Sequence, residues 1–268
     1  MHACKPKFLI SILAALLLYG LFPVSARRAK ASDEDRKDYR ELMEYEGDLG
    51  VNSVIRLSIE KRAKQISGVY FLKRTLKDIP LEGEYITDRD IVLHETDKDG
   101  IAGATFSLAF AEKDPRGHFN SDRPLTDEVL TGSWSNADNT ESHPVYLYLM
   151  CERFLAKDET RYSVAGSTND ALAEKNAQSF YSAVLKGNRL LAAKYVDFPL
   201  SFNWKGKPVQ ALTMRDFLRD YDSIFTKDFV SKIAAGIPHN MWASDQGIRL
   251  GDGEVWFDGK GKASHLTN

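Results

Sequence analysis

The sequence predicts an α+β protein in which an antiparallel β-meander precedes a domain of mixed helices and strands. Short segments that alternate apolar and polar residues recur roughly every ten positions between residues 50 and 155, as strands of a meander do. From residue 169 onward the apolar residues follow helical spacing, interrupted by hairpin patterns. With 268 residues, of which 43% are hydrophobic, the chain is long enough to bury two cores of ordinary size.

The N-terminal segment 1–26 has the three-part pattern of a secretory signal peptide. Lys5 and Lys7 precede an uncharged apolar run over 8–22, and the small-residue exit Val24-Ser25-Ala26 follows it. The run is short for a membrane span, although an uncleaved N-terminal anchor is the alternative. We therefore expect a periplasmic or secreted protein with no membrane span after signal cleavage.

Residues 27–49 are predicted to form a charged helical segment. Acidic residues stand early in it, Tyr39, Leu42 and Met43 fall on one helical stripe, and Gly47 would end the helix. This narrow stripe can pack on another element but cannot form a core alone.

Residues 50–155 are predicted to form the β-meander domain, either a sandwich or a small barrel. No helical crossover interrupts the strand series, so a parallel sheet is not expected. The strands expected from alternation and apolar runs lie at 54–59, 69–72, 91–94, 105–110, 132–134 and 145–150.

Residues 156–168 are the predicted linker, because charged and turn residues concentrate there, and residues 169–268 form the second domain. This domain opens with a helix that Asn169 can cap and Gly187 ends. A hairpin around 205–207 follows, and Thr213 and Asp216 then resemble a capping box for an amphipathic helix. A shorter helix around 229–233 and a glycine-turn hairpin over 248–257 complete the pattern.

The second domain resembles the cystatin-like cone fold shared by nuclear transport factor two, ketosteroid isomerase and polyketide-cyclase-like proteins. The resemblance lies in the segments 180–187, 195–200, 216–225 and 247–257. It implies a curled antiparallel sheet around the helices, with a pocket at the open end of the cone. That pocket serves enzymes, ligand-binding proteins and protein contacts alike, so the fold alone leaves function open.

The sequence favours a non-catalytic binding protein, whose target is another protein or a small cell-envelope ligand. An inhibitor or immunity protein against an envelope-acting toxin or hydrolase is one concrete form. The near balance of 36 basic and 38 acidic residues argues against a nucleic-acid partner. The alternative is a small-pocket enzyme of isomerase, dehydratase or hydrolase type that uses the cone-fold cavity. Its carboxylate base cannot be assigned from the sequence, so no residue is predicted to be catalytic.

Polar and aromatic residues of the second domain are the candidates for ligand or partner binding. His239 and Asp245 lie near Trp242 and form a pair that could bind a polar ligand or move a proton. Alternatively, His239 lies in a turn and satisfies local backbone groups. The candidate binding residues are Tyr221, His239, Trp242, Asp245 and Trp256.

No metal and no cofactor are expected from the sequence. Residues 95–100 imitate the start of a calcium loop, but Phe106 stands where a bidentate glutamate is required. His94, His118 and His143 are scattered without ligand spacing.

Export is predicted to remove the segment that ends at Ala26, because Val24 and Ala26 are the small residues that follow the apolar run. The intact mass of the exported protein checks this cleavage and should correspond to a chain that begins at Arg27. A species that retains Met1 to Ala26 would indicate an anchor instead.

Overall fold

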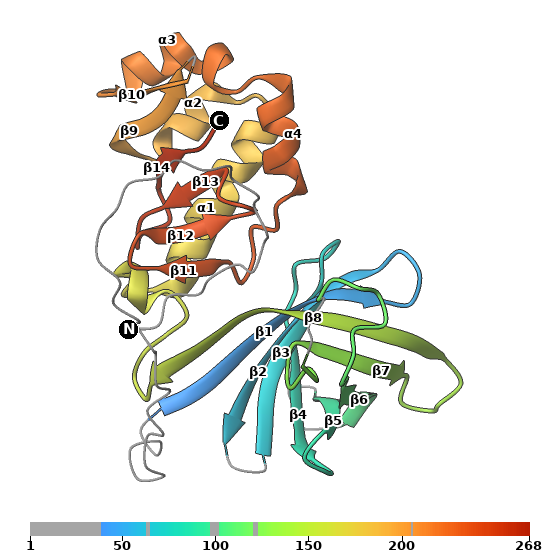
Figure 1. Cartoon of the computed structure of the whole chain (residues 1–268). Helices are drawn as coiled ribbons and strands as arrows, with labels where there is room; N and C mark the ends of the chain where they lie inside the picture. The colour runs from blue at the N-terminus through green and yellow to red at the C-terminus, as the bar shows by residue number, and fades with distance from the viewer. Residues whose placement is uncertain (1–38, 63–64, 97–101, 120–122, 205) are drawn as a thin grey trace, which may run out of the picture. The chain divides into compact units, whose positions relative to one another are not determined.

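The computed structural model describes residues 39–62, 65–96, 102–119, 123–204 and 206–268 (Figure 1). The signal peptide predicted over 1–26 lies outside the described residues. The chain divides into two compact units, Met1–Lys157 and Asp158–Asn268. The predicted α+β class holds at this level, because an antiparallel β-structure precedes a region that combines helices with a sheet.

Within the described residues of the first unit, eight strands pair in sequence order and close into an antiparallel barrel (Figure 1). The structure therefore selects the barrel over the sandwich. The strands are β1 (Tyr39–Leu49), β2 (Val54–Arg62), β3 (Gln65–Leu72), β4 (Ile79–Tyr85), β5 (Asp90–Thr96), β6 (Ala102–Phe110), β7 (Val129–Ser135) and β8 (Ser142–Ala156).

Antiparallel pairing of β1 with β8 closes the barrel, from Tyr39 opposite Ala156 to Leu49 opposite Val145. Alternate side chains of each strand point inward, and a closed barrel of this size is filled by them. The interior is a continuous apolar cluster that includes Tyr45, Leu57, Phe106 and Leu147.

The predicted helical segment 27–49 is wrong where the structure describes it, because residues 39–49 form strand β1. Leu42 and Met43 are neighbours in sequence and both are buried. In a strand they point to opposite faces, so both faces of β1 are covered at this position. Pairing with β2 and β8 outweighs the local helical pattern.

The predicted linker 156–168 is only partly a connecting segment. The boundary between the units falls at Lys157 and Asp158, inside the predicted range, and residues 157–160 are exposed. Tyr162, however, is fully buried and belongs to the core of the second unit. The short helix η2 (Ser163–Ala165) follows it. Residues 161–168 therefore include part of the second unit's core.

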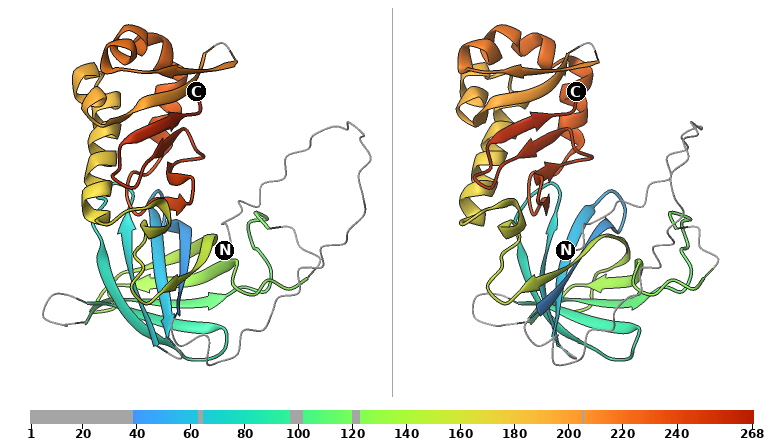
Figure 2. Two further views of the ribbon diagram at one scale, coloured as in Figure 1. Left: turned by 90° about the vertical axis from the view of Figure 1, so that its left-hand side faces the viewer. Right: turned by 60° about the vertical axis from the view of Figure 1, so that its left-hand side comes forward.

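The second unit places helices against a six-stranded sheet, and α1 runs along one face of that sheet (Figure 2). Its helices are α1 (Asp170–Leu185), α2 (Arg189–Lys194), α3 (Met214–Ile224) and α4 (Lys227–Ala235). Its strands are β9 (Val196–Trp204), β10 (Lys207–Ala211), β11 (Trp242–Ser244), β12 (Gly247–Leu250), β13 (Val255–Phe257) and β14 (Ala263–Leu266).

The strand order in this sheet is β10-β9-β14-β13-β12-β11. The expectation of a wholly antiparallel sheet is wrong at one place, because β14 pairs with β9 in parallel. The two strands are separated in the chain by α3, α4 and four further strands. A connection that long can return in either direction, whereas a tight hairpin enforces antiparallel pairing.

Local capping explains where two of the helices begin. The Asn169 side chain accepts a hydrogen bond from the Leu172 N–H at the start of α1. Thr213 and Asp216 form the predicted capping box at the start of α3, each accepting a backbone N–H of the other.

The apolar stripe of α3 enters an aromatic core as its periodicity predicts. Phe217 is fully buried, and its ring makes edge contacts with the rings of Phe198, Tyr221 and Phe225. On the opposite face of the helix the Asp222 side chain is 72% exposed and pairs with Arg189.

Truncating Phe217 to Ala is expected to destabilise the second unit by about 3–5 kcal/mol, since it leaves a cavity among three aromatic rings. Asp222→Asn is the matched control in the same helix. It should cost less than about 0.5 kcal/mol, because exposed ion pairs contribute little. Urea midpoints of both variants check the difference, and a strong effect of Asp222→Asn would contradict its placement on the surface.

Candidate functional site

Trp242 and Trp256 come together on the sheet face opposite the core. Arg249 of β12 is the register partner of Trp242 on β11 and of Trp256 on β13. The two indole rings meet edge to face with centroids 5.9 Å apart. The Arg249 guanidinium carbon lies 4.4 Å from the Trp242 ring centroid, in cation–π contact. Trp242, Arg249 and Trp256 form what we call the Trp–Arg–Trp row, and all three side chains are partly exposed.

The row leaves two hydrogen-bond donors open. Within the described residues, neither indole N–H donates to a protein acceptor. An indole N–H can only donate, and the guanidinium likewise carries donors and no acceptor. The row therefore combines aromatic area with two unused indole donors, which suits a partner that offers hydrogen-bond acceptors.

His239 does not pair with Asp245. Its Nδ1 lies in very close contact with Oε1 of Glu174 on α1, and both side chains are largely buried. Asp245 lies in the exposed turn between β11 and β12. The alternative prediction, that His239 satisfies only local backbone groups, does not account for this contact either, because Glu174 lies 65 positions away in the chain.

Glu174 ties three segments of the second unit together. Its Oε2 accepts a hydrogen bond of 3.0 Å from the Tyr162 hydroxyl, which in turn accepts one of 2.9 Å from the Met241 N–H. Its Oε1 accepts from the Asn240 N–H as well as facing His239. Because Tyr162 comes before α1 and Met241 follows α4, one carboxylate fixes both chain segments to the helix. The sequence carries no local signal for this contact.

Tyr221 points into the aromatic core and away from the Trp–Arg–Trp row. Its hydroxyl is buried without a hydrogen-bond partner among the described residues. Burial raises the pKa of this hydroxyl, against the opposing effect of Arg189. Of the five candidate residues, only Trp242 and Trp256 are therefore brought into contact.

The loop between β6 and β7 carries a polar group that the sequence analysis did not single out. The Asp114 carboxylate accepts hydrogen bonds from the backbone N–H groups of Arg116 and Phe119 and from the Tyr146 hydroxyl. These bonds lower the pKa of Asp114, although burial alone would raise it. The signal in the sequence is Asp114-Pro115-Arg116-Gly117, a turn pattern with an aspartate at its first position.

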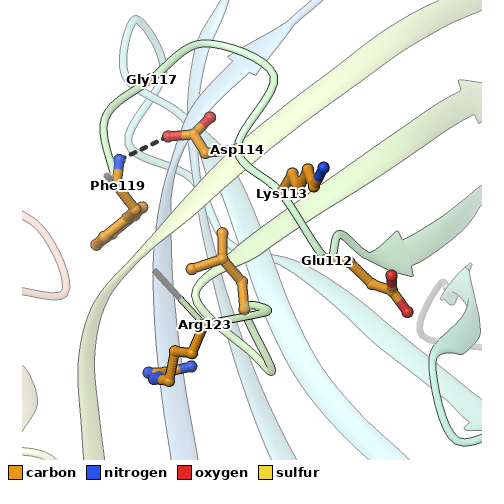
Figure 3. A pocket seen from close by; sticks show the side chains of 7 residues that line it. Glu112, Lys113, Asp114, Gly117, Phe119 and Arg123 are labelled. Carbon is orange, nitrogen blue, oxygen red and sulfur yellow. Dashed lines mark hydrogen bonds between the residues drawn. The ribbon is translucent and has the colours of Figure 1, made fainter. Parts of the chain in front are cut away.

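The same loop borders two hollows of the barrel unit. One is a cavity of about 400 Å³ lined by Glu112, Lys113, Asp114, Phe119, Arg123 and Leu125, and the Phe119 N–H donates to Asp114 at its edge (Figure 3). The other, the outer-wall cleft, measures about 160 Å³ and is lined by Glu46, Asp48, Arg116, His118, Tyr146 and Tyr148, among others.

Glu174→Gln is expected to destabilise the second unit by about 1–3 kcal/mol, since it puts an amide donor against the donors of Tyr162 or His239. Asp245→Asn is the matched control, because Asp245 is an exposed turn residue of the same unit. It should change stability by less than about 0.5 kcal/mol. Equal urea midpoints for both variants would show that the Glu174 hydrogen bonds do not stabilise the second unit.

Comparisons with known proteins assign no family to this chain. No family model, curated protein or solved structure matches this chain. Among the described residues no helix is long and apolar enough to cross a membrane. In that same part of the chain no group of three or more His, Cys, Asp or Glu side chains could hold a metal ion.

Proposed function

We propose that this chain is an exported, non-catalytic binding protein of the periplasm or the cell exterior. Its target is a protein partner, and an inhibitor or immunity protein against an envelope-acting toxin or hydrolase is the concrete form we favour. A small cell-envelope ligand is the other target that the sequence suggests. The N-terminal pattern of the sequence supports export, and the Trp–Arg–Trp row supports binding.

The Trp–Arg–Trp row is the observation that carries this proposal. Trp and Arg are enriched among the residues that contribute most to protein–protein binding, and they act best when held rigid near the centre of a contact. Here strand register holds all three side chains, and ring contacts fix their orientation. Little side-chain entropy would be lost when a partner covers them.

We also propose that the second unit has the cystatin-like cone fold. Its order of elements supports this, since helices α1 and α2 precede a hairpin, two further helices and a closing series of antiparallel strands. The packing of α1 against one face of the sheet supports it as well. The parallel pairing of β9 with β14 departs from the antiparallel sheet that the resemblance implies.

One observation favours the alternative, a small-pocket enzyme that uses this unit. Glu174 and His239 are two ionisable groups that converge in a largely buried position. Each oxygen of the Glu174 carboxylate already accepts a hydrogen bond from the protein. This arrangement fits a structural role for Glu174 better than the role of a catalytic base. An activity lost in Glu174→Gln at unchanged stability would support the enzyme.

Trp256→Ala and Trp242→Ala are expected to weaken partner binding by about tenfold or more each, because each removes a rigid aromatic anchor. The immobilised chain 27–268 is used to capture a partner from envelope extract, and the dissociation constant is then measured with the purified partner.

Leu190→Ala is the control, since Leu190 is an exposed apolar residue of α2 outside the row. It should bind as the wild-type chain does. A partner that binds wild type and both tryptophan variants equally would refute this use of the row, and so would the capture of none.

A further inference from the structure

We propose that the outer-wall cleft of the barrel is a second binding site, which takes the ring of a neutral sugar. This inference does not rest on the Trp–Arg–Trp row, which belongs to the other unit. Asp48 lies opposite Tyr146 and Glu46 opposite Tyr148 in the pairing of β1 with β8. Arg116 and His118 reach the same place from the β6–β7 loop.

The size of the cleft suits one small ring. Its volume is about 160 Å³. Pockets for drug-sized ligands are larger, at about 300–1,000 Å³. A single hexose ring is a ligand of this smaller scale.

The charges around the cleft favour a neutral ligand. Glu46 forms an ion pair of 2.6 Å with Arg56, and Asp48 pairs with Arg116. Each lining carboxylate is therefore compensated by a guanidinium. A neutral ligand leaves both ion pairs in place and can use the remaining lone pairs of both carboxylates.

Hydrogen bonds in the loop determine which nitrogen of His118 can accept. The Tyr146 hydroxyl donates to Asp114 Oδ1 at 2.7 Å, and His118 Nδ1 lies 3.2 Å from the same hydroxyl. Since the hydroxyl proton is already used on Asp114, we infer that His118 donates from Nδ1. Nε2 of the neutral ring is then an acceptor.

The lining thus offers acceptors and donors side by side. His118, Glu46 and Asp48 accept, and the Arg116 guanidinium donates. A hydroxyl group both donates and accepts, so a polyhydroxylated ring can satisfy this mixture, whereas a ligand that carries only donors or only acceptors cannot.

Stacked rings give the cleft a rigid apolar side. The His118 ring stacks on Tyr148 with centroids 5.1 Å apart and planes 9° from parallel. The Arg116 guanidinium carbon lies 4.0 Å from the Tyr146 ring centroid. His118 covers one face of Tyr148 and Arg116 covers one face of Tyr146, so the exposed His118 ring is the flat surface that can meet the slightly positive C–H groups of a sugar. Aromatic walls combined with paired polar groups therefore fit a carbohydrate.

The experiment titrates the full mature chain with three probes by calorimetry: methyl glucoside, which is neutral, glucosamine, which is cationic, and glucuronic acid, which is anionic. Methyl glucoside should bind tightest of the three. A neutral glucose trisaccharide is a fourth probe. Tighter binding of the trisaccharide identifies the end of a glycan as the ligand, and binding no tighter than the monosaccharide identifies a free sugar.

Two variants test the residues. His118→Ala should weaken methyl glucoside binding by about tenfold or more, because it removes one wall and one acceptor. Arg116→Ala should turn the preference toward glucosamine, since Asp48 then loses its compensating charge. His94→Ala is the control, because His94 is an exposed histidine of the same unit on β5.

Unchanged urea midpoints for His118→Ala and Arg116→Ala would show that the barrel stays folded. Equal losses in His118→Ala and His94→Ala would overturn the proposal. Absence of neutral-sugar binding at millimolar concentration would overturn it as well, and so would tighter binding of either charged sugar to the wild-type chain.

Discussion

The pairing of β1 with β8 is the constraint on which the barrel unit depends. A meander without this pairing would expose two strand edges, and exposed edges recruit other chains. Closure satisfies both edges and encloses the apolar interior. The same ladder sets Asp48 beside Tyr146 and Glu46 beside Tyr148 on the outer wall. The pairing that closes the barrel therefore also assembles one side of the outer-wall cleft.

This constraint also explains why the sequence predicted a helix where β1 forms a strand. Period-2 alternation marks a strand only when one face meets solvent. Leu42 and Met43 are both buried, so the strand has adjacent apolar residues that also fit a helical stripe. Strand β4 escaped prediction for a different reason, because Pro80 and Gly83 are poor strand residues. Partners on both sides hold it in the sheet. In both places non-local pairing outweighs local preference.

The second unit shows where local signals are sufficient and where they fail. Asn169 and the pair Thr213 and Asp216 predicted the helix starts correctly, since a cap acts within three residues of itself. The Trp–Arg–Trp row depends on the register of three strands, which no local pattern specifies. Glu174 and His239 meet only because α1 packs near the segment after α4. The candidate residues Trp242 and Trp256 could thus be named from the sequence, but their contact could not.

Native-state hydrogen exchange of the mature chain tests the central claim, that residues 39–49 close the barrel as a strand. Amides of β1 that donate to β2 or β8 should exchange as slowly as those of β2 and β8, because all three strands open only with the barrel. Fast exchange across β1 beside slow exchange in β2 and β8 would contradict closure. It would also remove the wall on which the outer-wall cleft is built.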